Sequence, residues 1–235
     1  LIHSATMVAA GVFLLARAFG LFAASHVTLE TILVIGALTA AVGAVLATAQ
    51  NDIKRILAYS TVSQLGLMVM AIGAGSAVAG MFHLTTHAFF KSLLFLTAGA
   101  FIHRFHTNDI FEIGAKGGKK ELLPLATLAI GLFSLSGIFP FAGFFSKDLL
   151  LESLHHGHAF FYWVGVAVSF LTAYYSFRLL FVILFSKVHA DKHGHEHAHG
   201  SALVNFCGAL PLAGLAAISV IVGLKGTSVF DFKLL

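Results

Sequence analysis

Long apolar stretches separated by short polar segments dominate this sequence of 235 residues. A helix that crosses a bilayer needs about 20 consecutive apolar residues. Scanning for stretches of that length predicts helices at about 2–18, 30–49, 54–75, 78–104, 121–156, 160–186 and 202–224. The pattern therefore indicates an all-α, polytopic membrane helix bundle.

The stretch at about 121–156 is too long for one straight crossing, and it contains Gly137, Pro140 and Gly143. Proline removes a backbone N–H donor and clashes with the preceding helical turn, and glycine adds flexibility. We therefore predict a discontinuous helix with halves at about 121–139 and 143–156. Irregular backbone at membrane depth persists only inside protein or beside water, and broken helices often mark ion sites in transporters.

The composition strengthens the membrane assignment, because 58% of the residues are hydrophobic and only 10% are charged, against about 25% charged in a soluble domain. The net charge of +4 reports loop topology, not nucleic acid or another acidic partner. Basic residues gather at 54–55, 104–120 and 187–192, and the positive-inside rule places that side in the cytoplasm. The segment at 105–120 is read as a linker. Cys207, the single cysteine, excludes an internal disulfide and a cysteine-based metal cluster.

Three ionisable residues follow one another at i, i+4 and i+8 in the predicted helix at 78–104: His83, His87 and Lys91. This spacing places them on one helix face and spreads them over roughly 12 Å of membrane depth. A lysine at the centre of a membrane helix costs about 3 kcal/mol, so Lys91 is expected to face the bundle interior. Desolvation disfavours a charged lysine, and histidine titrates near physiological pH. The row therefore has the character of a stepwise proton path.

Two other interpretations of this row stay open. It could consist of two packed core histidines and a structural lysine, or the two histidines could bind a metal, because His-x-x-x-His suits one helix face. No glutamate follows His83, so the zinc-protease form is absent. Thr86 lies beside the row, and its hydroxyl could hold a water. Intramembrane ionisable residues are functional by default, which favours proton transfer.

Lys147 follows the break of the discontinuous helix and is next to Asp148. A lysine beside unwound carbonyls suits a second proton station, but an interfacial lysine that extends to the membrane surface fits the spacing equally well. Ser63 and Gln64, in the predicted helix at 54–75, could hydrogen-bond neighbouring helices or line a water chain.

Histidines outside the row are also candidates for chemistry. His3 lies in the first predicted helix, where a lone histidine is more often a core residue. The segment at 189–199 contains five histidines that could bind zinc or nickel. Because that segment shows no fixed ligand geometry, a solvated loop is the favoured interpretation.

Five motifs carry a resemblance to a known family. They are LIHSATMVAAGVFLLAR at 1–17, QNDIKRILAYSTVSQLGLM at 50–68, FHLTTHAFFKSLLFL at 82–96, PFAGFFSKD at 140–148 and TAYYSFRLLF at 172–181. Together they resemble subunit L of respiratory complex I, the proton-translocating NADH:quinone oxidoreductase. They are also similar to the large subunit of multisubunit sodium/proton antiporters, which belongs to the same superfamily.

The resemblance implies two repeats of five helices with inverted topology, each with one broken helix. It assigns the end of the first repeat to about 1–19, the second repeat to about 28–186 and one additional helix to about 202–224, all within one transmembrane domain at 1–235. A first repeat, with its own glutamate and lysine, is then expected before Leu1. On this view the sequence is the C-terminal part of a longer chain.

The resemblance also implies roles for the polar residues. Lys91 would be the central proton carrier, Lys147 the exit or connecting carrier, and His3, His83 and His87 would help to bridge waters along the path. The expected function is proton translocation in a bacterial inner membrane, coupled to electron transfer in other subunits, and the alternative is a sodium/proton antiporter subunit.

The same resemblance sets expectations for cofactors and partners. The sequence lacks a G-x-G-x-x-G motif and has only one cysteine, so no NADH, flavin, quinone or iron–sulfur cofactor is expected in this chain. Its expected partners are lipid, protons and other membrane subunits of complex I, a chain M-like neighbour among them. A scaffold whose charges serve only packing, and a metalloenzyme using His83 and His87, are the remaining hypotheses.

Overall fold

The computed structural model describes residues 7–155, 157–187 and 202–225. Helices make up the described structure: α1 Ala9–Arg17, α2 Phe19–Phe22, α3 His26–Ala49, α4 Ile53–Gly73, α5 Ala77–Phe105, α6 Ile110–Ala115, the 3-10 helix η2 Gly118–Lys120, α7 Leu122–Ser136, α8 Ala142–His155, α9 Ala159–Phe185 and α10 Ala202–Lys225. No β-strand forms within these described ranges. His3 and the segment at 189–199 lie outside them.

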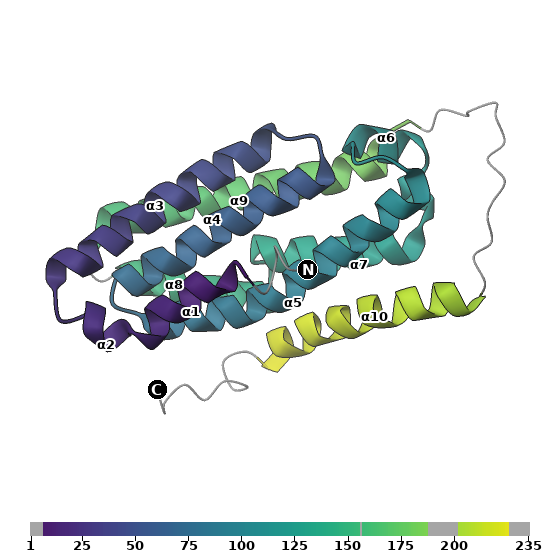
Figure 1. Cartoon of the computed structure of the whole chain (residues 1–235). Helices are drawn as coiled ribbons and strands as arrows, with labels where there is room; N and C mark the ends of the chain where they lie inside the picture. Colours follow the sequence, from purple (N-terminus) through teal and green to yellow (C-terminus); the bar gives the residue numbers. More distant parts are fainter. Residues whose placement is uncertain (1–6, 156, 188–201, 226–235) are drawn as a thin grey trace.

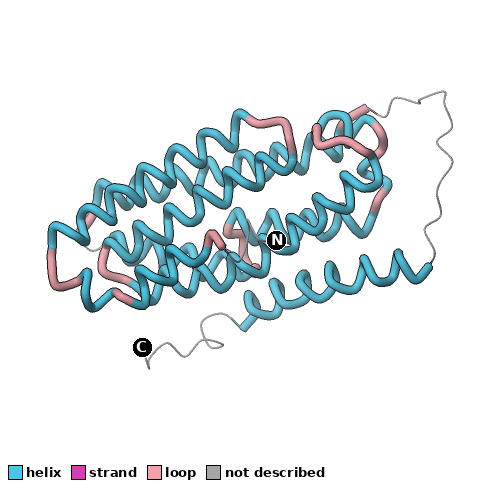
Figure 2. Tube along the Cα trace, in the orientation of Figure 1, coloured by secondary structure: helices cyan, strands magenta, loops and turns pink. Residues whose placement is uncertain are grey.

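Four of these helices are long and apolar enough to cross a membrane, namely α3, α4, α5 and α9. They lie side by side along the long axis of the molecule, together with α7 and α8, and α10 runs along one side of the bundle (Figure 1). Most connecting loops gather at the two ends of the bundle (Figure 2). The prediction of an all-α, polytopic bundle is confirmed.

The predicted discontinuous helix is confirmed as α7 and α8. The first half ends at Ser136, where Gly137 adopts a left-handed backbone with φ of 77° and donates its N–H to the Ser134 carbonyl. The second half begins at Ala142 and packs directly on the first, since a Cβ added to Gly143 would lie 1.7 Å from the Ser134 carbonyl oxygen. Glycine is therefore required where the two half-helices meet.

The segment at 105–120 is not the simple linker that the sequence suggested, because it contains the short helix α6. Asp109 caps this helix: its carboxylate accepts hydrogen bonds from the backbone N–H groups of Phe111 at 2.7 Å and Glu112 at 3.3 Å. Ile110 and Ile113 are fully buried in the core shared by α4, α5, α7 and α9. The Gly and Lys residues suggested a loop, but the Asp109 cap and the burial of the two isoleucines stabilise a short helix there.

A pair of backbone hydrogen bonds ties the start of α4 to the start of α6. The Ile53 N–H donates to the Asn108 carbonyl at 2.9 Å, and the Ile110 N–H donates to the Asn51 carbonyl at 3.0 Å. Asp52 and Asp109, the residues that cap the two helices, face each other in this bridge. We call these two hydrogen bonds the loop clamp.

Candidate functional site

Helix α5 carries the predicted row into the interior of the bundle. His83, His87 and Lys91 are each at most 1% exposed, and the ring centroids of the two histidines lie 6.3 Å apart. The edge of the Phe90 ring packs against His87 at 5.3 Å between centroids. The three side chains thus share one buried face of α5, as their spacing predicted.

His83 connects three helices through its ring nitrogens. Its Nε2 lies 3.0 Å from the Gln64 Oε1 on α4, and its Nδ1 lies 2.8 Å from the Ser146 Oγ on α8. Thr86, one turn along α5, donates its hydroxyl to the same Ser146 oxygen at 2.9 Å. The structure therefore brings Gln64 and Thr86 to the row. It also adds Ser146, which the sequence analysis did not select although it immediately precedes Lys147.

Lys91 reaches from α5 to α4. Its Nζ donates to the Leu57 carbonyl at 3.2 Å and to the Ser60 hydroxyl. Ser60 precedes Gln64 by one helical turn and so shares its face of α4. The two acceptors are neutral. Within the described ranges, no aspartate or glutamate lies within ion-pair distance of Lys91.

Lys147 lies at the break between α7 and α8. Its side chain is 5% exposed and passes beside Gly137, because a Cβ on that glycine would lie 3.1 Å from the lysine Cδ. The Lys147 Nζ and the His87 Nε2 are buried without a hydrogen-bond partner among the described residues. Buried polar atoms of this kind are commonly satisfied by ordered water, so this part of the row suits water-mediated proton exchange.

Two predicted supporting residues point away from the row. Ser63 donates its hydroxyl to the Ala40 carbonyl on α3 at 2.9 Å, so it belongs to the contact between α3 and α4. Asp148 is exposed, and as the next residue on α8 it points about 100° away from the buried Lys147. A shared helix and a polar side chain did not suffice to place either residue beside the row.

Helix α9 contributes two further buried groups that the sequence analysis missed. Thr172 accepts a hydrogen bond from the Gln64 Nε2 at 3.3 Å. The Tyr175 hydroxyl is fully buried beside Thr172, Ser60 and Gln64. Polar side chains from α4, α5, α8 and α9 thus converge on one axis inside the bundle.

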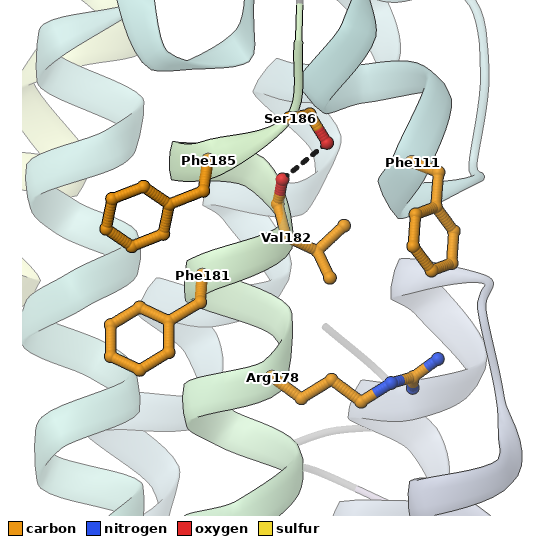
Figure 3. A pocket seen from close by; sticks show the side chains of 6 residues that line it. All are labelled: Phe111, Arg178, Phe181, Val182, Phe185 and Ser186. Atoms are coloured by element: carbon orange, nitrogen blue, oxygen red, sulfur yellow. Dashed lines mark hydrogen bonds between the residues drawn. The ribbon is translucent and has the colours of Figure 1, made fainter.

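The end of α9 carries an open surface pocket, lined by Phe111, Arg178, Phe181, Val182, Phe185 and Ser186 (Figure 3). Arg178 donates to the carbonyls of Thr48 at 3.2 Å and Gln50 at 2.7 Å, and to the Asn51 side chain. It therefore holds the connection between α3 and α4 and is separate from the row. No three metal-ligating side chains gather anywhere in the described part of the chain.

Comparison with known proteins decides the family. A family described as "NADH:quinone oxidoreductase/Mrp antiporter, TM" matches residues 1–173. The chain belongs to this family. The family match together with the four apolar spans makes it an integral, multi-pass membrane protein.

Relatives within the NADH:quinone oxidoreductase/Mrp antiporter family are close in sequence. "NADH-quinone oxidoreductase subunit L" of Rickettsia felis is 47% identical over 204 residues, which are 87% of this chain and 32% of that relative. The protein of the same name from Campylobacter jejuni is 44% identical over 238 residues, covering 99% of this chain and 38% of that relative. The resemblance to subunit L is confirmed. The chain spans about a third of the length of the curated relatives it matches.

Solved structures of the same architecture extend the likeness to the fold. A chain of the membrane-bound sulfane sulfur reductase, an archaeal respiratory membrane complex, matches with a TM-score of 0.81 and 26% identity over 97% of this chain and 46% of that one. A chain of the Mrp complex from Dietzia sp. matches with a TM-score of 0.80 and 23% identity over 93% of this chain and 48% of that one. The latter likeness concerns the fold alone.

Proposed function

We propose that this chain is part of a membrane-arm subunit of a proton-pumping NADH:quinone oxidoreductase. The relatives named above support this assignment. The observation that carries it is the buried row on α5, where Lys91 contacts only neutral acceptors at full burial. A lysine held this way can exist in its neutral form, which a carrier needs in order to take up and release a proton.

We assign roles along the axis as follows. Lys91 is the central proton carrier, and Lys147, at the break of α7 and α8, is the exit or connecting carrier. His83 and His87 help to bridge waters along the path between the two lysines, with Thr86 and Gln64 in support, and His3, outside the described residues, contributes in the same way. Lys147 and His87 each present a buried nitrogen without a direct partner among the described residues, which suits transfer through water.

The wider setting follows from this assignment. The protein would lie in a bacterial inner membrane beside other membrane subunits, a chain M-like neighbour among them, and would bind no cofactor of its own. Electron transfer would take place in those other subunits, so this chain would be the translocase part of the enzyme. The helices between about 28 and 186 would form one antiporter-like repeat, with the end of another at 1–19.

A sodium/proton antiporter subunit is the second candidate, favoured by the description of the matched family, which names the Mrp antiporter beside NADH:quinone oxidoreductase. The two candidates differ in the driving reaction. Isolating the native complex and measuring NADH:quinone activity distinguishes them, since an antiporter complex would exchange ions without electron transfer.

The test of the primary proposal replaces Lys91 in the full-length subunit within its assembled complex. Lys91→Met removes the amine but keeps most of the length of the side chain, and Lys91→Ala removes everything beyond Cβ. Both should lower NADH-driven proton pumping into liposomes by about 100-fold or more, the scale of losing a proton-transfer group. Lys54→Ala, at an exposed lysine on α4, should pump normally. An assembled Lys91→Met complex that pumps normally would overturn the carrier role.

A further inference from the structure

The two ring nitrogens of His83 face chemically different partners. The Nε2 lies 3.0 Å from the Gln64 Oε1, whereas the Nδ1 lies 2.8 Å from the Ser146 hydroxyl. In a neutral imidazole, one nitrogen donates a proton and the other accepts one. Which nitrogen carries the proton is set by the hydrogen bond that the other one makes.

Thr172 on α9 determines the orientation of the Gln64 amide. The Thr172 hydroxyl donates its single proton to the Val168 carbonyl at 2.8 Å, so its oxygen can only accept from Gln64. The Gln64 Nε2, at 3.3 Å, supplies that hydrogen bond. Gln64 and Thr172 are both fully buried, so bulk water does not compete for these groups.

The remaining end of the Gln64 amide is its Oε1, which only accepts hydrogen bonds and faces the His83 Nε2. We infer that Thr172 and Gln64 fix His83 in the tautomer that carries its proton on Nε2 and direct the Nδ1 lone pair toward Ser146. The Ser146 hydroxyl lies closer to this nitrogen, at 2.8 Å, than to the carbonyls of Ala142 at 3.3 Å and Gly143 at 3.4 Å on its own helix. It can therefore donate to the nitrogen while accepting from Thr86. Thr172 and Gln64 are thus positioning residues that act through the histidine.

This arrangement restricts how His83 handles protons, and here the inference rests on the proposed function. A proton that arrives on Nδ1 forms an imidazolium whose Nε2–H remains hydrogen-bonded to the Gln64 oxygen. An amide oxygen does not pass a proton onward as a hydroxyl or water does. The proton therefore enters and leaves His83 at Nδ1, on the side of α8 and Lys147, and the Nε2 serves only to hold the ring.

The experiment reads the tautomer directly, by ¹⁵N solid-state NMR of the full-length subunit in lipid with labelled histidine. The His83 signals are assigned by their loss in His83→Gln. We expect the Nε2–H form in the native protein. Thr172→Val removes the acceptor that orients Gln64 and should populate the Nδ1–H form, whereas Thr172→Ser should keep the native form.

A matched control is Thr61→Val on α4. Thr61 is buried, and its hydroxyl donates to the Leu57 carbonyl of its own helix at 2.9 Å, so this change should leave the His83 tautomer unaltered. In the assembled complex, Thr172→Val should slow pumping on the order of tenfold, the scale of removing a partner that orients a functional histidine. Thr172→Ser and Thr61→Val should pump at the native rate.

The inference is overturned if native His83 carries its proton on Nδ1, or if Thr172→Val leaves the tautomer unchanged. Should Thr172→Val not assemble, Gln64→Leu removes the Nε2 acceptor itself and must change the His83 signals for the inference to stand. The proposed function is tested separately. Normal pumping by Lys91→Met would overturn the proposed function and would not affect the tautomer result. An unaltered tautomer in Thr172→Val would overturn the inference about His83 and would leave the proposed function standing.

Discussion

Helix α4 has two faces that are built in opposite ways. Toward α3 it presents small residues, and a Cβ added to Gly66 would lie 2.4 Å from the Ala40 backbone nitrogen. One added to Gly73 would lie 2.4 Å from the Leu33 nitrogen. Toward α5 and α9 it presents Ser60 and Gln64, which hydrogen-bond Lys91, His83 and Thr172. We call the first contact the glycine seam and the second the polar seam.

Helix α4 therefore combines close backbone packing on one face with support of buried polar side chains on the other. Close approach of backbones through small residues is the usual basis of strong helix packing in lipid, where no hydrophobic drive between helices exists. The glycine seam leaves no room for a side chain at Gly66 or Gly73. The polar seam holds long side chains with buried atoms that lack direct protein partners in the described structure, among them the His87 Nε2. Rigidity on one face allows the buried polar groups on the other to keep fixed positions.

The substitution for which we predict the greatest loss of stability places a bulky side chain in the glycine seam. Gly66→Leu would push a side chain into the α3 backbone, which cannot move aside as a flexible side chain can, so a cost above about 3 kcal/mol is expected. The amount of assembled complex in membranes, measured on native gels, should fall sharply. Gly99→Leu is the control, because Gly99 on α5 is exposed with open space around it. Equal assembly of the two variants would contradict the close packing of α3 and α4.

A pair of serines on opposite faces of α4 sharpens the comparison. Ser63→Ala removes the hydrogen bond to the Ala40 carbonyl in the glycine seam and should cost about 0.6 kcal/mol of stability, with proton pumping unchanged. Ser60→Ala removes an acceptor of Lys91 in the polar seam and should slow pumping more than it lowers stability. Thermal unfolding and liposome pumping of both complexes check this. Loss of pumping in Ser63→Ala alone would reverse the assignment of the two faces.

The smallest effect is expected at Gly131 on α7, which is close to α5 but meets only a side chain there. A Cβ at this position would lie 2.7 Å from the Leu94 Cδ2, and the end of a leucine can shift. Gly131→Ala should therefore change the unfolding temperature little, because the gain in helix propensity, up to about 1 kcal/mol, offsets the repacking. A loss of stability as large as that of Gly66→Leu would show that this side-chain contact resists displacement as strongly as a backbone contact does.

Much of the fold was predictable because membrane helices are defined by length and hydrophobicity. The break between α7 and α8 could be read from Gly137, Pro140 and Gly143. Helix α6 could not, because its short length gives no periodic signal and its stability comes from the Asp109 cap and two buried isoleucines. The local sequence therefore predicts the long apolar helices well and the polar segment between α5 and α7 poorly.

The site was predictable only within a single helix. Spacing placed His83, His87 and Lys91 on one face, since all three lie on α5. It did not reveal Ser146 or Thr172, because their contacts depend on how α8 and α9 rotate against α5 and α4. For the same reason the sequence left open whether Ser63 bonds a neighbouring helix or lines a water chain, and it hydrogen-bonds α3 in the glycine seam. Contacts between helices are determined by packing that no one-dimensional pattern specifies.

The loop clamp at the start of α4 fixes the position of this helix along its own axis. Its hydrogen bonds fix Ile53 against the segment that follows α5, and Ser60 lies seven residues further, roughly 10 Å along the helix axis. If α4 shifted along its axis by one turn, about 5.4 Å, the Ser60 hydroxyl would no longer lie opposite Lys91. Lys91 would then face a residue from another turn of α4. Two backbone hydrogen bonds between α4 and the segment before α6 thus help to fix which groups meet inside the bundle.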